Sequence, residues 1–226
     1  HVAFDDATAI NAGDAMLAVG FEILAESKEI APDNLSKLIT AIGEMVRKVA
    51  EGQQEDIEFE DREHVTEEEY IAMIAGKTSA MFETGARTGA ILANASQDAV
   101  ENMARWGLNL GLCFQLMDDL IDITGDTATL GKPAGSDIVQ GKKTLIAIHA
   151  IGCGLDLPHF NKVYGTGECD DRDLSRAVDE LRESGSIDYA KEKAMEHHAL
   201  ANSCLDELEE SEAVGLLREL TDFQLI

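Results

Sequence analysis

Apolar residues recur at three- and four-residue steps along most of this 226-residue chain, a spacing typical of α-helices that bury one face. From Ala7 to Ser27 they are dense enough to predict a mostly buried helix, and from Leu35 to Val49 they predict an amphipathic one. Thr66 and Glu69 form a capping-box pattern, which predicts that a helix rich in Ala and Gly begins there. Further helical segments are predicted at about residues 97–124, 144–152, 170–184, 187–208 and 213–220.

The composition agrees with an all-α fold. Hydrophobic residues make up 45% of the chain, but aromatic residues make up only 5%, and the whole chain holds three prolines. Long helices are therefore favoured, because the apolar residues are mainly aliphatic and proline, which breaks helices, is rare. The length has room for one large domain or at most two small ones.

The chain is strongly acidic, with a formal net charge of −26. This charge repels the phosphates of nucleic acids and of anionic lipids, so we expect no nucleic-acid partner. It suits either a well-solvated surface or the binding of metal cations, and charge alone does not decide between these two interpretations.

The cysteines and the uncharged runs bear on the cellular compartment. Cys113, Cys153, Cys169 and Cys204 form no CxxC pair, so we expect free thiols and no structural zinc site. Uncharged runs such as Trp106–Met117 are about 12 residues long, whereas a bilayer-spanning helix needs roughly 20. Because the N-terminus does not resemble a signal sequence, we expect no transmembrane segment and a cytoplasmic location.

The stretch FQLMDDLIDITGD places several carboxylates within an apolar row. On a helix Asp118 and Asp119 lie three and four positions after Gln115, and Asp122 lies four and three positions after them, so the side chains share one stripe. Unpaired carboxylates in apolar surroundings are costly and raise one another's pKa values. Either this stripe is solvated, or a positively charged ligand lies on it.

Lysines follow the acidic stripe closely in a chain that has few of them. Lys132, Lys142 and Lys143 lie within about 20 residues of it, on a segment rich in Gly. Carboxylates that hold Mg²⁺ and leave coordination positions open for phosphate oxygens, together with lysines that neutralise the remaining charge, would bind a diphosphate.

Four short motifs resemble those of the trans-isoprenyl diphosphate synthases, the polyprenyl synthetase family that includes farnesyl and geranylgeranyl diphosphate synthases. FQLMDDLIDITGD resembles the family's second DDxxD motif, and LGKPAGSDIVQGKKT resembles its GKxxGxDxxxGKxT loop. GKTSAMF and EGQQED resemble its Lys-Thr helix and its GQxxD motif. The motifs occur in the family's order between Glu51 and Thr144, and looser similarity such as ATAINAGDAML extends over nearly the whole chain.

The resemblance implies roles for individual residues. It implies Mg²⁺ binding by Asp118 and Asp122, with Asp119 beside them as a third metal-site residue. The residues that would contact the allylic diphosphate are Lys77, Thr78, Gln115, Lys132 and Lys142. Those expected to be catalytic are Lys77, Asp118 and Lys132. Gln53 and Asp56 would orient Lys77 or the substrate by hydrogen bonds, and a polar helix end is the alternative explanation for them.

The resemblance also implies a fold and a reaction. We expect an isoprenoid synthase-type helical bundle around a central cavity, with residues 1–226 as a single polyprenyl synthetase domain and a homodimer as the assembly. The reaction would condense an allylic diphosphate with isopentenyl diphosphate, and the apolar cavity would keep water from the cation that develops. In the family, product length depends largely on bulky residues near the first DDxxD motif, and family frequency favours a C20 product.

One family feature has no counterpart in the chain. The first DDxxD motif and the arginines after it are missing, and Asp5 and Asp6 do not replace it, because Ala9 stands where the third Asp belongs. We therefore expect a domain truncated at its N-terminus, and we expect Asp5 and Asp6 to be surface or capping acids. A non-catalytic subunit of a heteromeric prenyl synthase is the alternative. A terpene cyclase of similar fold fits less well, because cyclases do not usually need the lysine loop.

Overall fold

The computed structural model describes residues 1–125 and 135–225, and within these ranges the regular structure is entirely helical. The elements are α1 (Asp6–Glu26), α2 (Pro32–Glu60), α3 (Glu67–Ile74), the π-helix η1 (Ala75–Ser79), α4 (Ala80–Leu92), α5 (Gln97–Thr124), α7 (Ser136–Gln140), α8 (Leu145–Gly152), α9 (Pro158–Val163), α10 (Asp171–Glu183), α11 (Ser186–Asp206) and α12 (Glu212–Phe223). The prediction of an all-α fold is confirmed.

Six of the described helices begin at a residue whose side chain caps the helix. Thr66 and Glu69 form the predicted capping box at the start of α3, and the Ser96 hydroxyl accepts from the backbone of Ala99 to begin α5. Asp5 caps α1 in the same way, which confirms its predicted capping role. The short helices α7 and α9 were not predicted, because five or six residues are too few to show a helical period.

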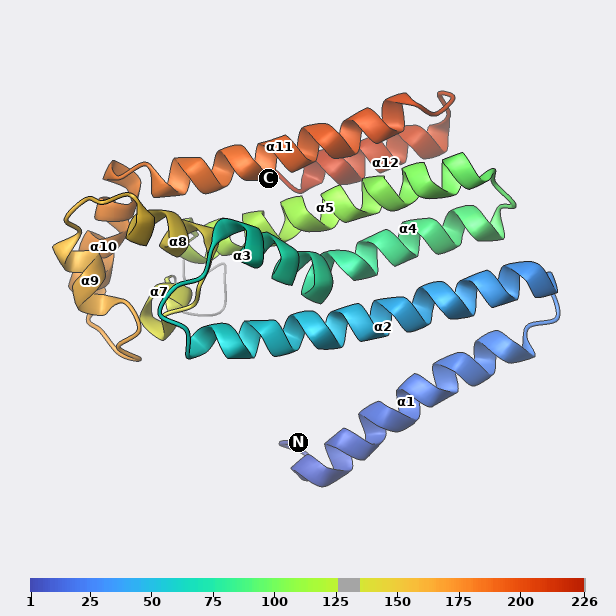
Figure 1. Ribbon diagram of the computed structural model, residues 1–226, viewed down its shortest axis with the longest axis horizontal. Coiled ribbons are helices and arrows are strands. Elements are labelled where there is room, and N and C mark those ends of the chain that lie inside the picture. Colours follow the sequence, from blue (N-terminus) through green and yellow to red (C-terminus); the bar gives the residue numbers. More distant parts are fainter. Residues whose placement is uncertain (126–134, 226) are drawn as a thin grey trace.

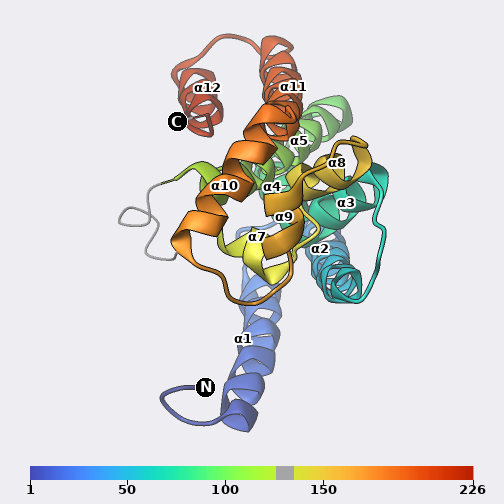
Figure 2. The same ribbon diagram turned by 90° about the vertical axis from the view of Figure 1, so that its left-hand side faces the viewer.

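The long helices α2, α4, α5 and α11 lie side by side in that order (Figure 1). Helix α5 is the central element, packed between α4 and α11, and it buries small residues where neighbours approach closely. The main hydrophobic core lies around the C-terminal half of α5, and it includes Leu112, Leu116, Leu120, Tyr70 and Phe160. A second core joins Trp106 and Leu110 to α11 and α12. The short helices α7 to α10 gather at one end of the bundle (Figure 2).

A π-helix interrupts the segment that the sequence predicted as one continuous helix. At η1 the backbone of Gly76 and Lys77 approaches Gly52 of α2 so closely that a Cβ at Gly52 would lie 2.4 Å from the Lys77 nitrogen. Only glycine therefore fits at position 52 without a backbone shift. Such π-bulges occur often at functional sites.

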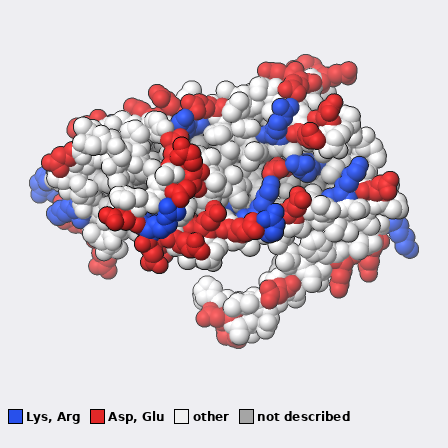
Figure 3. All heavy atoms as spheres, viewed as in Figure 1, with Lys and Arg blue, Asp and Glu red and all other residues white. Residues whose placement is uncertain are grey.

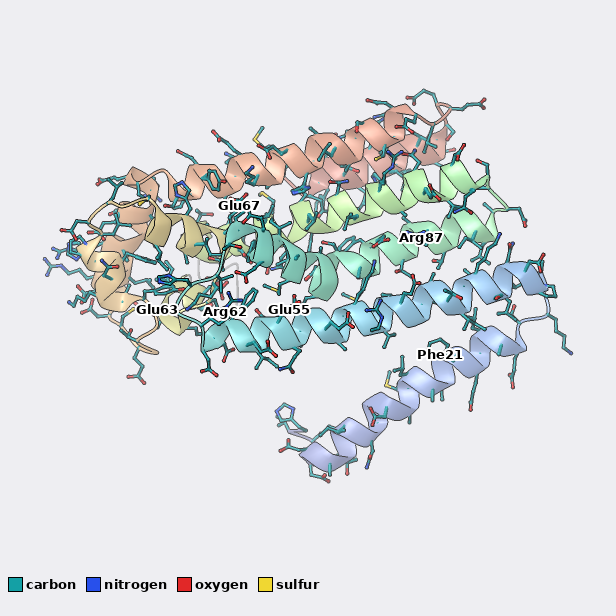
Figure 4. All side chains as sticks on the ribbon, viewed as in Figure 1. Phe21, Glu55, Arg62, Glu63, Glu67 and Arg87 are labelled. Atoms are coloured by element: carbon teal, nitrogen blue, oxygen red, sulfur yellow. The ribbon has the colours of Figure 1, made fainter. Side chains whose placement is uncertain are left out.

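Helix α1 differs from its prediction, since none of its residues is buried. It leans away from the bundle and makes contact mainly near its C-terminal end, where Phe21 and Leu24 are half-buried (Figures 1 and 4). The apolar side chains that are dense along α1 are thus not buried by the rest of the described chain. By length and composition alone, α1 is apolar enough to cross a membrane, although soluble core helices pass the same test. The expectation of no transmembrane segment therefore stays a prediction.

Candidate functional site

A charged hollow lies where the C-terminal halves of α2 and α5 meet α3, η1 and the segment from α7 to α8. Most of its polar lining comes from the motifs that the sequence singled out. The lining includes Asp56, Lys77, Gln115, Asp118, Asp119, Asp137, Lys142 and Lys143. The structure thus brings residues more than 80 positions apart in the chain into one site.

The three aspartates of α5 have different surroundings although they share a helix face. Asp118 is exposed, whereas Asp119 and Asp122 are 7% and 1% exposed. Asp118 and Asp119 both line the hollow, the first exposed and the second buried, whereas the buried Asp122 does not line it. Of the three aspartates, only Asp118 therefore agrees with the solvated alternative.

Asp119 lies in a buried hydrogen-bond relay that joins three elements. The Tyr70 hydroxyl of α3 donates to Asp119 Oδ2 at 2.5 Å, and Gln115 Nε2 donates to Asp119 Oδ1 at 2.9 Å. Gln115 Oε1 in turn accepts from the Thr78 hydroxyl of η1 at 2.9 Å. Burial raises the pKa of Asp119 to about 7, and the bonds from Tyr70 and Gln115 oppose that shift.

Asp122 connects α5 to the start of α7. Its Oδ1 accepts from the Ser136 hydroxyl at 2.8 Å, and its Oδ2 accepts from the Asp137 backbone N–H at 3.0 Å. A buried carboxylate with a donor on each oxygen is well stabilised. Asp122 therefore joins α5 to the lysine-bearing segment, which runs from α7 to Lys142 and Lys143.

The lysine-bearing segment turns sharply at Gly141, which has a φ of 74°. A Cβ there would lie 2.8 Å from the Cα of Gly165, so the turn also depends on a close backbone approach. Lys142, just after the turn, forms an ion pair with Asp137 at 2.7 Å. The Lys143 ammonium lies 5.4 Å from the centre of the Tyr164 ring.

Lys77 reaches the hollow from η1 and pairs with Asp56 of α2 at 2.5 Å. Both side chains are about one-third exposed, so the pair lies at the edge of the site and not within the core. The close approach of α2 at Gly52 brings the two elements near enough for this contact. The pairing agrees with the predicted role of Asp56 in orienting Lys77, and it argues against a mere polar helix end.

The predicted site residues do not all lie in the hollow. Gln53 is exposed on α2 and is not among the residues that line the hollow. Lys132 lies outside the described residues, so its predicted contact with the diphosphate stays a prediction. The hollow is also lined by residues to which the sequence assigned no role, namely Tyr70, Met73, Ile74, Asp137 and Thr144. Asp137 stands within the quoted GxD motif, whereas Tyr70 carries no signal beyond its place in an apolar helix.

The donor set suits a divalent cation that is shared with a phosphate group. Within residues 1–125 and 135–225 no three His, Cys, Asp or Glu side chains are grouped as a self-sufficient metal site. Mg²⁺ is usually held by one or two carboxylates plus phosphate oxygens and water, which matches an exposed Asp118 beside several lysines. The residues present therefore fit Mg²⁺ bound together with its ligand.

The helical bundle and this site define a class of protein, the all-α proteins in which an aspartate-bearing helix and a lysine-bearing segment line one hollow. The model of the polyprenyl synthetase family matches residues 1–181. A geranylgeranyl pyrophosphate synthase of Geoglobus acetivorans is 36% identical over 223 residues, which are 99% of this chain and 68% of that protein. A geranylfarnesyl diphosphate synthase of Natronomonas pharaonis is also 36% identical, over 99% of this chain and 64% of that protein.

Solved structures give the same result. The crystal structure of a geranylgeranyl pyrophosphate synthetase from Pyrococcus horikoshii Ot3 superposes with a TM-score of 0.89 at 38% identity. The match covers 97% of this chain and 67% of that one, so this chain spans about two thirds of the length of its relatives. The chain belongs to the polyprenyl synthetase family.

Proposed function

We propose that the protein is a prenyltransferase that condenses an allylic diphosphate with isopentenyl diphosphate to give a longer trans-polyprenyl diphosphate, geranylgeranyl diphosphate being favoured. The observation that carries this proposal is the meeting of Asp118 with Lys77, Lys142 and Lys143 in one hollow. Relatives named as geranylgeranyl synthases support the C20 product. A cyclase, which does not usually need the lysine loop, is not favoured by this arrangement.

The side chains of the hollow have different proposed roles toward the diphosphate. Lys77 from η1 and the lysines after Gly141 supply positive charge that neutralises the departing group. We propose that Asp118 holds Mg²⁺, which when bound supplies electrophilic stabilisation of the leaving diphosphate. Asp119 and Asp122, predicted as metal residues too, would support Asp118 from the protein interior, since both oxygens of each accept hydrogen bonds.

An apolar groove lies directly beside Asp118, with a volume of about 250 Å³. Phe114, Met117 and Ile121 of α5 form one wall, and Phe223, the last residue of α12, contributes to the other. Apolar side chains next to the charged site would receive hydrocarbon and keep water from an allylic cation as it develops. The double bond of isopentenyl diphosphate attacks that cation, and loss of a proton then completes the product.

The test is a condensation assay on the longest natural form of the protein. Radiolabelled isopentenyl diphosphate is supplied with dimethylallyl, geranyl or farnesyl diphosphate in the presence of Mg²⁺, and product length is read by chromatography. We expect turnover to fall by about 10²-fold or more in Asp118→Ala, because the carboxylate proposed to hold Mg²⁺ is lost. Glu101→Ala is the matched control, because it removes an exposed carboxylate from the same helix nearly five turns away.

Absence of product with every allylic partner would contradict the proposal and favour a non-catalytic subunit. Equal turnover of Asp118→Ala and Glu101→Ala would leave a prenyltransferase but remove the proposed metal role.

We also propose that the protein assembles as a homodimer through α1. This helix has no buried residue and carries neither Lys nor Arg, and in Figure 3 its surface is white with few acidic side chains. Its exposed apolar residues include Ile10, Met16, Leu17, Val19 and Ile23. Analytical ultracentrifugation of the longest natural form should show a dimer that dissociates in Leu17→Glu. A monomeric wild-type protein would refute the assembly.

The cytoplasmic location also remains a proposal.

A further inference from the structure

Tyr70 is the one large polar side chain of α3 that reaches both the hydrophobic core and the charged hollow. It is 2% exposed and belongs to the main core, yet it also lines the hollow. A buried tyrosine hydroxyl needs a hydrogen-bond partner, and this one donates to Asp119 at 2.5 Å. The hydroxyl therefore contacts Asp119, the middle aspartate of the metal motif.

The relay beyond Asp119 has a defined direction. The Gln115 amide presents its nitrogen to Asp119, and Nε2 donates to Asp119 Oδ1 at 2.9 Å. This orientation turns the Gln115 carbonyl toward Thr78, whose hydroxyl donates to it at 2.9 Å. One N–H of Gln115 is left over from this arrangement, and Gln115 lines the hollow.

We propose that Tyr70 is a positioning residue for the diphosphate, acting through Asp119 to hold the Gln115 amide in one orientation. This inference rests on the proposed function, since Gln115 and Thr78 are expected to contact the allylic diphosphate. Without the Tyr70 hydroxyl, Asp119 loses one of its two donors and is free to rotate about its side-chain torsion. Gln115 then loses the contact that fixes which end of its amide faces the ligand.

The chain offers a closely matched control in Tyr189. Its hydroxyl also donates to a carboxylate at 2.5 Å, that of Glu67, which Figure 4 labels at the start of α3. Neither Tyr189 nor Glu67 lines the hollow. Tyr70→Phe and Tyr189→Phe therefore remove the same chemical group and the same type of bond, but only the first removal touches the relay.

The experiment measures two quantities in the longest natural form of the protein. Steady-state kinetics give KM for the allylic diphosphate and kcat, and calorimetry gives the affinity for inorganic diphosphate with Mg²⁺. We expect Tyr70→Phe to raise KM and to weaken diphosphate binding by about tenfold, the size of one charge-assisted hydrogen bond, with a smaller change in kcat. Tyr189→Phe should change neither quantity. Thermal unfolding confirms that both variants are folded at the assay temperature.

A double-mutant cycle separates positioning from simple loss of stability. If Tyr70 acts through Gln115, then adding Tyr70→Phe to Gln115→Leu has no further effect on diphosphate affinity. Additive effects, or a Tyr70→Phe protein that behaves like Tyr189→Phe, would overturn the inference. If Tyr70→Phe folds poorly, Gln115→Leu alone tests the relay from its other end. Unchanged diphosphate affinity in Gln115→Leu would also overturn the inference.

The two readouts also separate this inference from the proposed function. A wild-type protein that makes no product but binds diphosphate, with binding weakened in Tyr70→Phe, would refute the reaction and support the relay. A wild-type protein that binds no diphosphate would refute both.

Discussion

At the scale of single residues, the site depends on where each carboxylate of α5 points. The sequence predicted that Asp118, Asp119 and Asp122 share a helix face, and the structure confirms that they converge near the lysine-bearing segment. Sequence spacing does not show burial, which depends on what packs against the helix. The partners Tyr70 and Ser136 therefore could not be found from the motif.

The buried carboxyl of Asp119 makes the stability of the protein depend on pH. Burial raises its pKa to about 7 from an ordinary 3.8, so the folded state binds this proton more tightly than the unfolded state. The stabilisation is fully present below pH 3.8 and is lost as the pH rises through about 7. Asp119→Asn keeps the shape of the neutral form but does not titrate.

Urea unfolding without divalent metal, at about pH 5 and about pH 8, checks this dependence. Between these values the wild type should lose roughly 2.5–3 kcal/mol relative to Asp119→Asn, at about 1.4 kcal/mol for each pH unit between 5 and the pKa of about 7. A difference between the two proteins that stays constant with pH would show that Asp119 is ionised in the fold at both values.

At the scale of elements, the sequence predicted the long helices because their apolar period and caps are local signals. It missed η1 and placed α1 in the core, and both errors have the same physical cause. The π-helix is stabilised by tertiary contact with α2 at Gly52, and the exposure of α1 depends on which surfaces meet it. Neither feature can be recognised from the sequence of a single helix.

Gly52→Ala tests whether close packing of α2 on η1 sets the position of Lys77. The added Cβ would lie 2.4 Å from the Lys77 nitrogen, so the backbone must shift, at about 1–3 kcal/mol of stability. The kcat/KM should fall as well, because Lys77 moves with this backbone. Urea unfolding and the condensation assay measure the two effects.

Gly43→Ala on the same helix provides the comparison for this prediction. No heavy atom lies within 4 Å of its Cβ position, so it should gain roughly 0.5–1 kcal/mol from helix propensity and keep full activity. Equal behaviour of the two variants would mean that the contact of Gly52 with η1 does not constrain the site.

At the scale of the whole molecule, the net charge of −26 acts on both stability and ligand binding. Figure 3 shows acidic side chains spread over the face with Lys and Arg between them, and the chain holds 44 Asp and Glu against 18 Lys and Arg. The acidic groups behind this net charge repel one another in the folded state, and they also repel a free diphosphate anion. A local group of lysines and a divalent cation are the physical means by which this protein can bind that anion.

Salt should therefore stabilise the fold. Raising KCl from about 0.05 M to about 0.5 M shortens the screening length and weakens repulsion between surface carboxylates, so Tm should rise by several degrees. Differential scanning calorimetry at constant pH measures the change. A Tm that falls across this range would show that attractive ion pairs such as Lys77–Asp56 outweigh the repulsion.

The most direct test of the central claim is calorimetric titration of the protein with inorganic diphosphate, with and without Mg²⁺. If Asp118 and the lysines of the hollow hold the same diphosphate through a shared Mg²⁺, binding should require the metal. It should then weaken by about tenfold or more in both Asp118→Asn and Lys142→Gln. Equally tight binding without Mg²⁺, or in either variant, would contradict the account.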